Sequence, residues 1–385
     1  MKVDYNISRL NYLLGLFKLS HTDLLALISE GLKKPITEKD INSKEINISV
    51  LKRIDKIFNK GLHYYLDPKA PETSKEASIF FRKHDFTIEL NIGAKKIVNH
   101  FEDFKISLSA LATLADINID RIMPIYKLSD NPKTVAKTIR EELYPVFQTD
   151  LKEFLKGLIT KFAERNILVF EFVETWNKKE KANIDGFFLN PNVIVLKRQQ
   201  LSFRREIFTI THELGHFLLN EEEIESLDYQ ILAKTNLSSI ENWCNDFAFH
   251  FLIGDKIQTF EDLDTADSTN DYHFTTIEEI SKKTHLSQIA LFTKLLFQKK
   301  ISNLNYNKIR NDFEEKYKAK VEEDKKLREL EKQNGTPQGG SAPQPIKSPL
   351  LVSTIQTAFY EGIINEYEVC KRLNIKPENL DKYIE

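Results

Sequence analysis

The chain has 385 residues, of which 41% are hydrophobic and 29% are charged, and its formal net charge at pH 7 is −2. This length allows two or three domains with a substantial core, and the near-zero charge excludes a globally basic nucleic-acid-binding protein, although not a local basic patch. The two cysteines, Cys244 and Cys370, give no disulfide framework, and no segment is typical of a signal peptide or a membrane span, so we expect a cytoplasmic protein without a membrane partner.

Residues 1–68 are predicted to form a small bundle of helices. Ser20 with Asp23 and Thr37 with Asp40 each fit a capping box, in which a helix begins at the Ser or Thr. Apolar residues recur at helical spacing around these signals. They are Leu10, Leu14, Phe17, Leu24, Leu25, Ile28, Leu51, Ile54, Ile57 and Phe58. This order of short helices resembles the lambda-repressor-like (XRE) helix-turn-helix.

A candidate DNA-reading helix lies at about residues 37–46. It carries Lys39, Asn42, Ser43 and Lys44, whose side chains can meet phosphates and base edges. The same stretch carries three acidic residues, which oppose DNA binding. DNA binding and a protein-interaction bundle that only keeps this shape therefore stay open as alternatives.

Residues 69–149 are predicted to form a helical connector that leads to a core at residues 150–310. The core pattern begins with an amphipathic helix from Asp150, followed by a strand (NILVFEFVE) and a strand hairpin (GFFLNPNVIVLK) with a turn at Asn190 and Pro191. These signals predict an α+β fold that is predominantly helical, with a small, mostly antiparallel sheet. The edge strand of such a sheet can hold an extended substrate by pairing with it.

An H-E-x-x-H motif, formed by His212, Glu213 and His216, follows the hairpin inside the segment FRREIFTITHELGHFLLNEEE. Ser202 can cap a helix here, and apolar residues recur along it at helical spacing. Two histidines at positions i and i+4 lie on one helical face, so both imidazoles can bind one Zn²⁺. The glutamate beside the first histidine points at the open position of the metal. The motif therefore predicts metal-assisted hydrolysis.

A zinc site with one open position needs a third protein ligand. The acidic run at residues 221–225 is close in sequence, but we expect it to form a solvated turn past the helix end. Glu241 is the better candidate because it opens a second helix, ENWCNDFAFHFLI, on which Asn245 shares its face and can orient a metal ligand. The alternative for Glu241 is a first-turn acid stabilised by the helix dipole. Tyr229 and His250 are the nearest candidates to stabilise an oxyanion, although a core role is favoured for His250.

The chain beyond these helices is predicted to remain mostly helical. Residues 276–300 contain two helical segments broken at His285, Leu286 and Ser287, a helix-turn-helix-like pattern that either packs against the core or contacts DNA. Residues 311–349 are predicted to form a charged helix and a flexible linker rich in Gly, Pro and Ser. Residues 350–385 regain helical periodicity and are predicted to form a C-terminal helical module.

The two candidate metal helices, FTITHELGHFLL and ENWCNDFAFHFL, resemble those of the ImmA/IrrE family of zinc-dependent metallopeptidases. The resemblance implies a zincin-like core in which Glu241 is the third ligand, as in gluzincins. It also implies an intracellular endopeptidase that cleaves a transcriptional repressor or a similar DNA-bound regulator, in a mobile-element, stress or defence response. Cys244 and Gly254 stand where the family usually has Ala and Pro, and these departures leave the ligands intact.

The residues and the resemblance together predict a zinc endopeptidase with one Zn²⁺ per chain. His212, His216 and Glu241 are expected to hold the ion, and Glu213 is expected to act as the general base. The alternative is a helix-turn-helix DNA-binding regulator whose zinc site is structural or inactive and which acts by binding a partner. Glu213 favours the enzyme, because a purely structural site needs no base beside an open ligand position.

Overall fold

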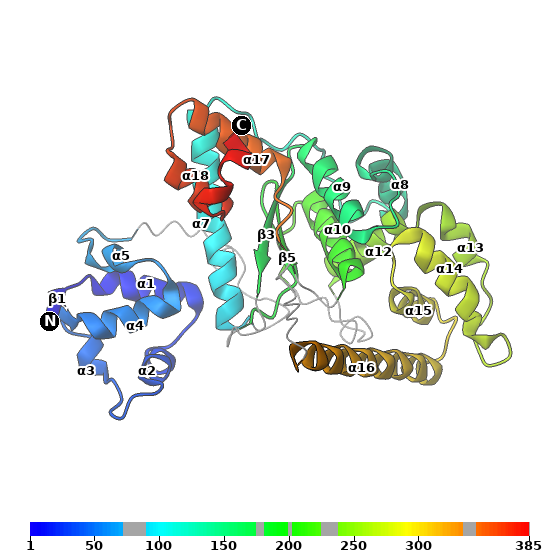
Figure 1. The fold of residues 1–385 in the computed structure, drawn as a ribbon, viewed down its shortest axis with the longest axis horizontal. Helices are drawn as coiled ribbons and strands as arrows, with labels where there is room; N and C mark the ends of the chain where they lie inside the picture. The colour runs from blue at the N-terminus through cyan, green and yellow to red at the C-terminus, as the bar shows by residue number, and fades with distance from the viewer. Residues whose placement is uncertain (72–89, 175–180, 199–201, 225–237, 334–343, 385) are drawn as a thin grey trace. The chain divides into compact units, whose positions relative to one another are not determined.

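The computed structural model of the chain describes residues 1–71, 90–174, 181–198, 202–224, 238–333 and 344–384 (Figure 1). Helices dominate the described residues, and the strands form one sheet of two strands and one of three. This confirms the α+β, predominantly helical class. The chain divides into two compact units, Met1–Leu108 with Lys178–Ile184, and Ser109–Asn177 with Asp185–Glu385.

The first unit contains a bundle of short helices closed by a two-stranded sheet. Strand β1 (Lys2–Asp4) pairs antiparallel with β2 (Glu45–Asn47). Its helices are α1 (Ile7–Phe17), α2 (His21–Ser29), α3 (Glu38–Ile41), α4 (Ile48–Phe58) and α5 (Leu62–Leu66). Ser20 caps α2 through the capping box with Asp23 that the sequence predicts. The interior of the bundle consists of buried aliphatic and aromatic side chains, including Leu10, Leu24 and Phe17.

The prediction of a helix over residues 37–46 is wrong beyond Ile41. Helix α3 is a single turn, and Asn42 forms its C-terminal cap. The next residues lead into β2, where Ile46 is fully buried between two exposed neighbours, the period-two pattern of a strand, and lies opposite Val3. Lys39, Asn42, Ser43 and Lys44 are exposed on this turn and the bend after it. Their contact with DNA stays a prediction.

Helix α7 (Ile92–Leu114) continues from the first unit into the second, and α8 (Pro132–Leu143) follows it with Asn131 as its N-cap. The central sheet of the second unit consists of β3 (Leu168–Val173), β4 (Gly186–Leu189) and β5 (Val193–Arg198) in the order β3-β5-β4. Strand β3 runs parallel to β5, whereas β4 runs antiparallel to it, so the sheet is mixed rather than mostly antiparallel. Side chains of β3 and β5 are buried on both faces, which is typical of parallel pairs.

Helices pack around this sheet and bury one continuous apolar core. They are α9 (Leu151–Ala163), α10 (Phe203–Leu219), α12 (Ser239–Ile253), α13 (Ile257–Glu261), α14 (Phe274–Thr284) and α15 (Gln288–Phe297). Figure 1 shows α10 beside the strands and α12 next to α10. Apolar side chains of α14 and α15, such as Ile280 and Leu291, enter the same core as the candidate metal helices. The two helices at residues 276–300 are thus packed into the core.

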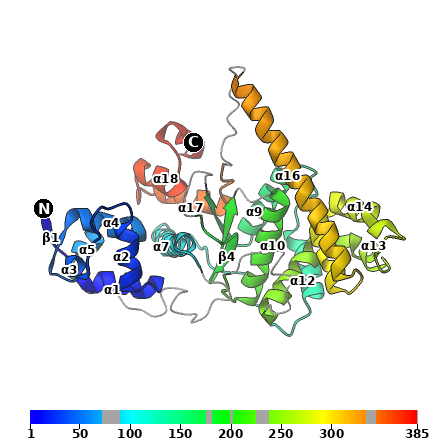
Figure 2. The ribbon, with the colours of Figure 1, turned by 90° about the horizontal axis from the view of Figure 1, so that it is seen from below.

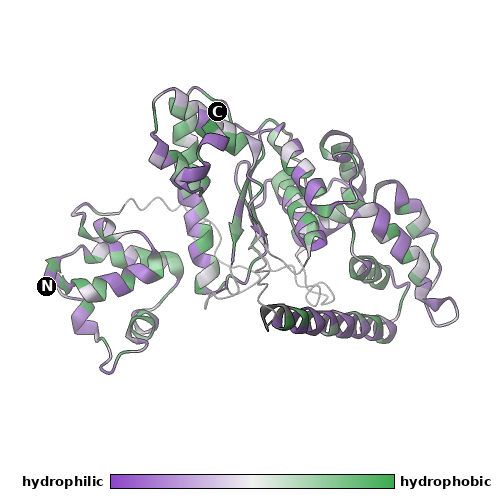
Figure 3. Ribbon diagram, in the orientation of Figure 1, coloured by the Kyte–Doolittle hydropathy of each residue, from purple (hydrophilic) through white to green (hydrophobic). Residues whose placement is uncertain are grey.

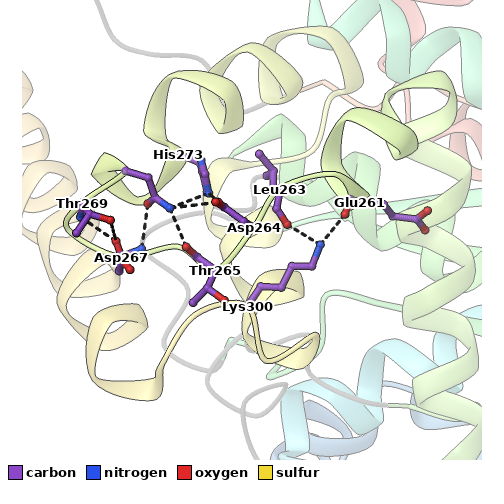
Figure 4. Close-up of polar contacts among 9 residues, drawn as sticks. Glu261, Leu263, Asp264, Thr265, Asp267, Thr269, His273 and Lys300 are labelled. Carbon is purple, nitrogen blue, oxygen red and sulfur yellow. Dashed lines mark hydrogen bonds and ion pairs between the residues drawn. The ribbon is translucent and has the colours of Figure 1, made fainter.

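The loop between α13 and α14 is tied to the end of α15 by polar contacts (Figure 4). The Lys300 ammonium donates to the main-chain carbonyls of Glu261 at 2.6 Å and Leu263 at 2.7 Å. Nε2 of His273 lies 2.6 Å from a carboxylate oxygen of Asp264. His273 and its two preceding residues all have positive φ angles, a left-handed turn that is rare outside glycine. The contacts hold this turn in place at the start of α14.

The C-terminal module docks on the central sheet of the second unit. Helix α16 (Asn303–Gln333) precedes it, is mainly hydrophilic in Figure 3, and extends beyond the other elements of this unit in Figure 2. The module consists of α17 (Pro349–Tyr360), α18 (Glu366–Leu373) and α19 (Asp381–Ile384), with α17 packed on α9 and β3. Just before α17, the main-chain N–H groups of Ile346 and Lys347 donate to the Glu171 carboxylate of β3 at 3.0 and 2.7 Å.

Glu171 also belongs to a buried ion network. The Arg198 guanidinium lies 2.6 Å from Glu171 and 2.8 Å from Glu206, and all three side chains are almost completely buried. Because Glu206 lies on α10, the network joins the C-terminal module, the sheet and the motif helix. Within the described ranges, no helix is both long enough and apolar enough to cross a bilayer.

Candidate metal centre

Helix α10 carries the H-E-x-x-H motif through the middle of the core. Ser202 caps it by accepting a hydrogen bond from the Arg205 main-chain N–H, as the sequence predicts. Every residue from Glu206 to Leu219 is buried, so the helix is covered on all faces rather than on one. His212 and His216 lie one turn apart on this helix, and both side chains are buried. Buried polar side chains need hydrogen-bonding or metal partners.

A close helix crossing brings the second candidate helix to the histidines. Ser238 caps α12 by accepting from the Glu241 N–H, which sets Glu241 in the first turn. Where α10 meets α12, a β-carbon built on Gly215 would lie 3.1 Å from the Cα, Cβ and Sγ atoms of Cys244. That separation is tighter than ordinary packing, so the glycine permits the crossing that places Glu241 beside the motif.

The structure brings His212, His216 and Glu241 into one group. Nε2 of His212 lies 3.1 Å from one carboxylate oxygen of Glu241, and Nε2 of His216 lies 3.0 Å from the other. The two Nε2 atoms are 3.1 Å apart, and all three side chains are buried. These ligand atoms lie within 4.8 Å of one another, and no other such group of three occurs among the described residues. Two imidazole nitrogens and a carboxylate oxygen suit a divalent metal such as zinc.

Each histidine is oriented by a hydrogen bond at its other ring nitrogen. Nδ1 of His212 lies 3.1 Å from the side-chain oxygen of Asn245, and Nδ1 of His216 lies 3.2 Å from the main-chain oxygen of Glu221. An oxygen can only accept, so in the neutral rings these contacts place the proton on Nδ1 and leave the Nε2 lone pairs for a metal. Asn245 is where the sequence places it, whereas the Glu221 carbonyl is a backbone partner that residue types do not indicate.

The carboxylate of Glu241 and the imidazole of His216 shift one another's pKa values towards the charged forms. Burial works to raise the pKa of Glu241, but His216 and His212 outweigh it and hold that pKa well below its usual range. Burial also works to lower the pKa of His216, and Cys244 and Glu241 raise it well above the ordinary value. A metal must therefore displace a proton when it binds here.

Glu213 lies where α10 meets the outer strand of the sheet. It is buried, and a β-carbon on Gly186 of β4 would lie 3.2 Å from its Cγ atom and 2.7 Å from Cγ2 of Thr209. Only glycine allows this strand so close to the helix, a requirement that sequence reasoning missed although Gly186 opens the predicted hairpin. A carboxylate held beside the ligand group, next to an outer strand, can accept a proton from a molecule bound there.

Of the two residues predicted to stabilise an oxyanion, only His250 can be placed. Tyr229 lies outside the described residues. His250 lies on α12 beside a separate pocket, where burial and Lys294 lower its pKa to about 4. It is therefore neutral at pH 7, and its pocket neighbours are Asp246 and Glu261 rather than the metal group.

The prediction that the acidic run after α10 is a solvated turn is wrong for Glu222 and Glu223, whereas Glu221 is exposed and Glu225 lies outside the described residues. Glu222 is buried, and its carboxylate accepts a hydrogen bond of 2.8 Å from the main-chain N–H of Asn190. Glu223 accepts one of 3.0 Å from the hydroxyl of Ser238. The helix ends at Asn220 in a left-handed conformation, which turns the chain back and joins these carboxylates to the sheet and to α12.

Comparison with known proteins identifies the region that holds this group. No curated protein and no solved structure matches the chain. The family match does not reach the N-terminal bundle, whose helix-turn-helix character stays a prediction. Residues 163–279, which include the three-stranded sheet, α10 and α12, match the family model of the IrrE N-terminal-like domain of peptidase family M78, a match that points to a metallopeptidase-type function for this part of the chain.

Proposed function

We propose that this protein is a zinc-dependent endopeptidase. His212, His216 and Glu241 would hold one zinc ion, and Glu213 would act as the general base. The observation that carries the proposal is the convergence of ligand atoms from α10 (His212 and His216) and α12 (Glu241) within 4.8 Å of one another, while α10 also carries Glu213. The Nδ1 contacts of both histidines support the assignment, because they direct both Nε2 atoms to the same point.

The chemistry follows from what each residue can do. A zinc ion bound to this group supplies Lewis acidity, which makes a water molecule easier to deprotonate and the scissile carbonyl easier to attack. Glu213 accepts the proton of the attacking water and then delivers it to the leaving amine. Glu213 is buried, so its carboxylate is kept away from bulk water and the proton it has accepted is delivered to the leaving amine rather than to solvent.

The substrate is proposed to bind as an extended strand along β4. Among the described strands, β4 is one of the two edge strands of the three-stranded sheet, and Gly186, its first residue, lies against Glu213. A peptide paired with β4 would thus pass the general base. The resemblance of the two helices to ImmA/IrrE peptidases supports a transcriptional repressor or similar cytoplasmic regulator as the target. DNA contact by the N-terminal bundle is part of the same proposal.

The central test compares the wild type with Glu213→Gln, which keeps the size of the side chain but cannot take a proton. Each protein is incubated with the regulator encoded beside it, and cleavage and zinc content are measured. We expect equal zinc and a loss of cleavage rate of about 10²–10⁴-fold. Glu278→Gln, on the exposed surface of α14, is the matched control and should cleave normally. If wild type and Glu213→Gln relieve repression equally without cleavage, the chain is a partner-binding regulator instead.

A second test addresses the third ligand. Glu241→Ala should lower the zinc content sharply, since it removes the only carboxylate of the ligand group. Glu221→Ala is the control, because Glu221 contributes its main-chain carbonyl, which the substitution keeps. Equal zinc in Glu241→Ala and the wild type would exclude Glu241 from the site.

A further inference from the structure

A cavity borders the metal-site helices α10 and α12 in the second unit. It has a volume of about 420 Å³ and opens between α10, α12 and α15. Phenylalanine rings from each of these helices form its walls: Phe208, Phe249 and Phe297. Phe297 is 49% exposed, which is unusual for so large an apolar side chain in a cavity wall. Volume and aromatic lining are those of a site for a small molecule.

The charged side chains that line this cavity, Asp246, Glu261 and Lys294, are each in an ion pair, Glu261 with a lysine outside the lining. The Lys294 ammonium pairs with the Asp246 carboxylate, and Lys133 pairs with Glu261 at 2.8 Å. His250, between these two pairs, is neutral because burial and Lys294 lower its pKa to about 4. An ionised ligand would find no unpaired charge of opposite sign among these groups, whereas a neutral ligand with polar edges could use their remaining donors and acceptors.

Asn245 connects the cavity to the metal group. Its side chain lines the cavity, and its oxygen lies 3.1 Å from Nδ1 of His212. Nδ1 and Nε2 lie on different edges of the imidazole, so the cavity faces the edge turned away from Glu241. A molecule in the cavity therefore cannot reach the reacting side of the metal, but it can move the residue that orients His212.

We infer that this cavity binds a small, uncharged heteroaromatic molecule as an effector, and that its binding changes the orientation of His212 through Asn245. The ring would stack among the three phenylalanines. Its edge would meet acceptors at Asp246, Glu261 and His250 and the donor at Lys294. The inference goes beyond the proposed peptidase activity: binding itself is independent of cleavage, while the link to His212 rests on the metal group.

Binding is tested on the full chain by ¹⁹F NMR with 5-fluoroindole and 5-fluorocytosine as neutral probes and 4-fluorobenzoate as the charged comparison. We expect the neutral probes to bind and 4-fluorobenzoate to bind at least about tenfold more weakly. Ala290→Trp, which fills the cavity from α15, and Phe297→Ala, a change at a half-exposed wall, should each weaken binding about tenfold. Absence of binding by the neutral probes, tighter binding of 4-fluorobenzoate, or unchanged affinity in both variants would overturn the proposal.

The link to His212 is tested with the cobalt-loaded protein, whose visible absorption reports on the ligands. Saturating 5-fluoroindole should shift this spectrum in the wild type, and Asn245→Ala should still bind the probe but show no shift. No shift in the wild type, or the same shift in Asn245→Ala, excludes the link. A chain that takes up no cobalt contradicts both the link and the proposed peptidase, while the NMR titration still decides whether the cavity is a site.

Discussion

His285 makes the stability of the second unit sensitive to acid. Its ring stacks on Phe154 of α9 with the ring centres 3.7 Å apart, and it is only 2% exposed. Nε2–H donates to the Gln148 main-chain carbonyl at 2.5 Å, whereas Nδ1 is buried without a hydrogen-bond partner. Protonation would place a charge on that atom next to Arg204 and Arg140, and burial accordingly lowers the pKa of His285 from 6.5 to about 4.

The size and direction of the effect follow from this pKa difference. The unfolded chain takes up a proton on His285 near pH 6.5, but the folded chain does not until about pH 4. The stabilisation is therefore complete above about pH 6.5 and is lost as the pH falls towards 4. Each unit of difference corresponds to about 1.4 kcal/mol, so the full loss is about 3 kcal/mol, of which about 2 kcal/mol is reached by about pH 5.

The assay is urea unfolding of the wild type and His285→Gln at about pH 7.5 and about pH 5. Glutamine keeps an N–H donor for the Gln148 carbonyl but does not titrate. The free energy of unfolding of the wild type, relative to that of the variant, should fall by about 2 kcal/mol between the two conditions. His63→Gln, at an exposed position, is the matched control. A difference between wild type and His285→Gln that stays the same at both pH values would refute this reasoning.

Three further predictions concern the metal-site helices and the C-terminal module. Gly215→Ala should gain about 1 kcal/mol from helix propensity but lose about 1–3 kcal/mol because its methyl group would collide with Cys244. We therefore expect a lower free energy of unfolding in urea and a lower zinc content after dialysis. A more stable variant with normal zinc content would contradict this prediction. Glu171→Gln breaks the buried pair with Arg198 and weakens the acceptor for Lys347, so the free energy of unfolding should fall by about 3–5 kcal/mol and the C-terminal module should become sensitive to protease, unlike in Glu278→Gln. Zinc affinity, measured by calorimetry, should fall as the pH drops below the raised pKa of His216, because the ion displaces that proton; an affinity that is independent of pH would count against His216 as a ligand.

The parts of the site that lie on single helices could be predicted from the sequence. The spacing of His212 and His216 sets them one turn apart, and the first-turn position of Glu241 on an amphipathic helix makes it available to a neighbouring helix. The close approach of α12 to α10 depends on Gly215, and that of β4 to α10 depends on Gly186; both roles are visible only when the opposing atoms are known. No sequence pattern distinguishes a glycine at a close contact between two elements from any other glycine.

Non-local contacts account for most of what the sequence did not reveal. Residues 42–46 fit a helical pattern locally, but pairing with β1 places Glu45 and Ile46 in a strand and leaves residues 42–44 as the bend before it. Glu222 belongs to an acidic run that local composition assigns to solvent, yet it caps an N–H group of the β4–β5 turn. Arg198, Glu171 and Lys347 stand far apart in the sequence, so nothing local indicates that the C-terminal module docks on the sheet.

The two histidines of the site differ in what a mutation can remove. His212 is held by the side chain of Asn245, which one codon change can delete. His216 is held by the main-chain oxygen of Glu221, which every amino acid at that position supplies. What matters there is the left-handed turn at Asn220, a conformation that glycine also adopts readily. Among natural variants of this chain, substitutions should thus be tolerated at position 221 but selected against at position 245. The orientation of His212 is therefore the first part of the metal group that a single substitution in its surroundings would remove.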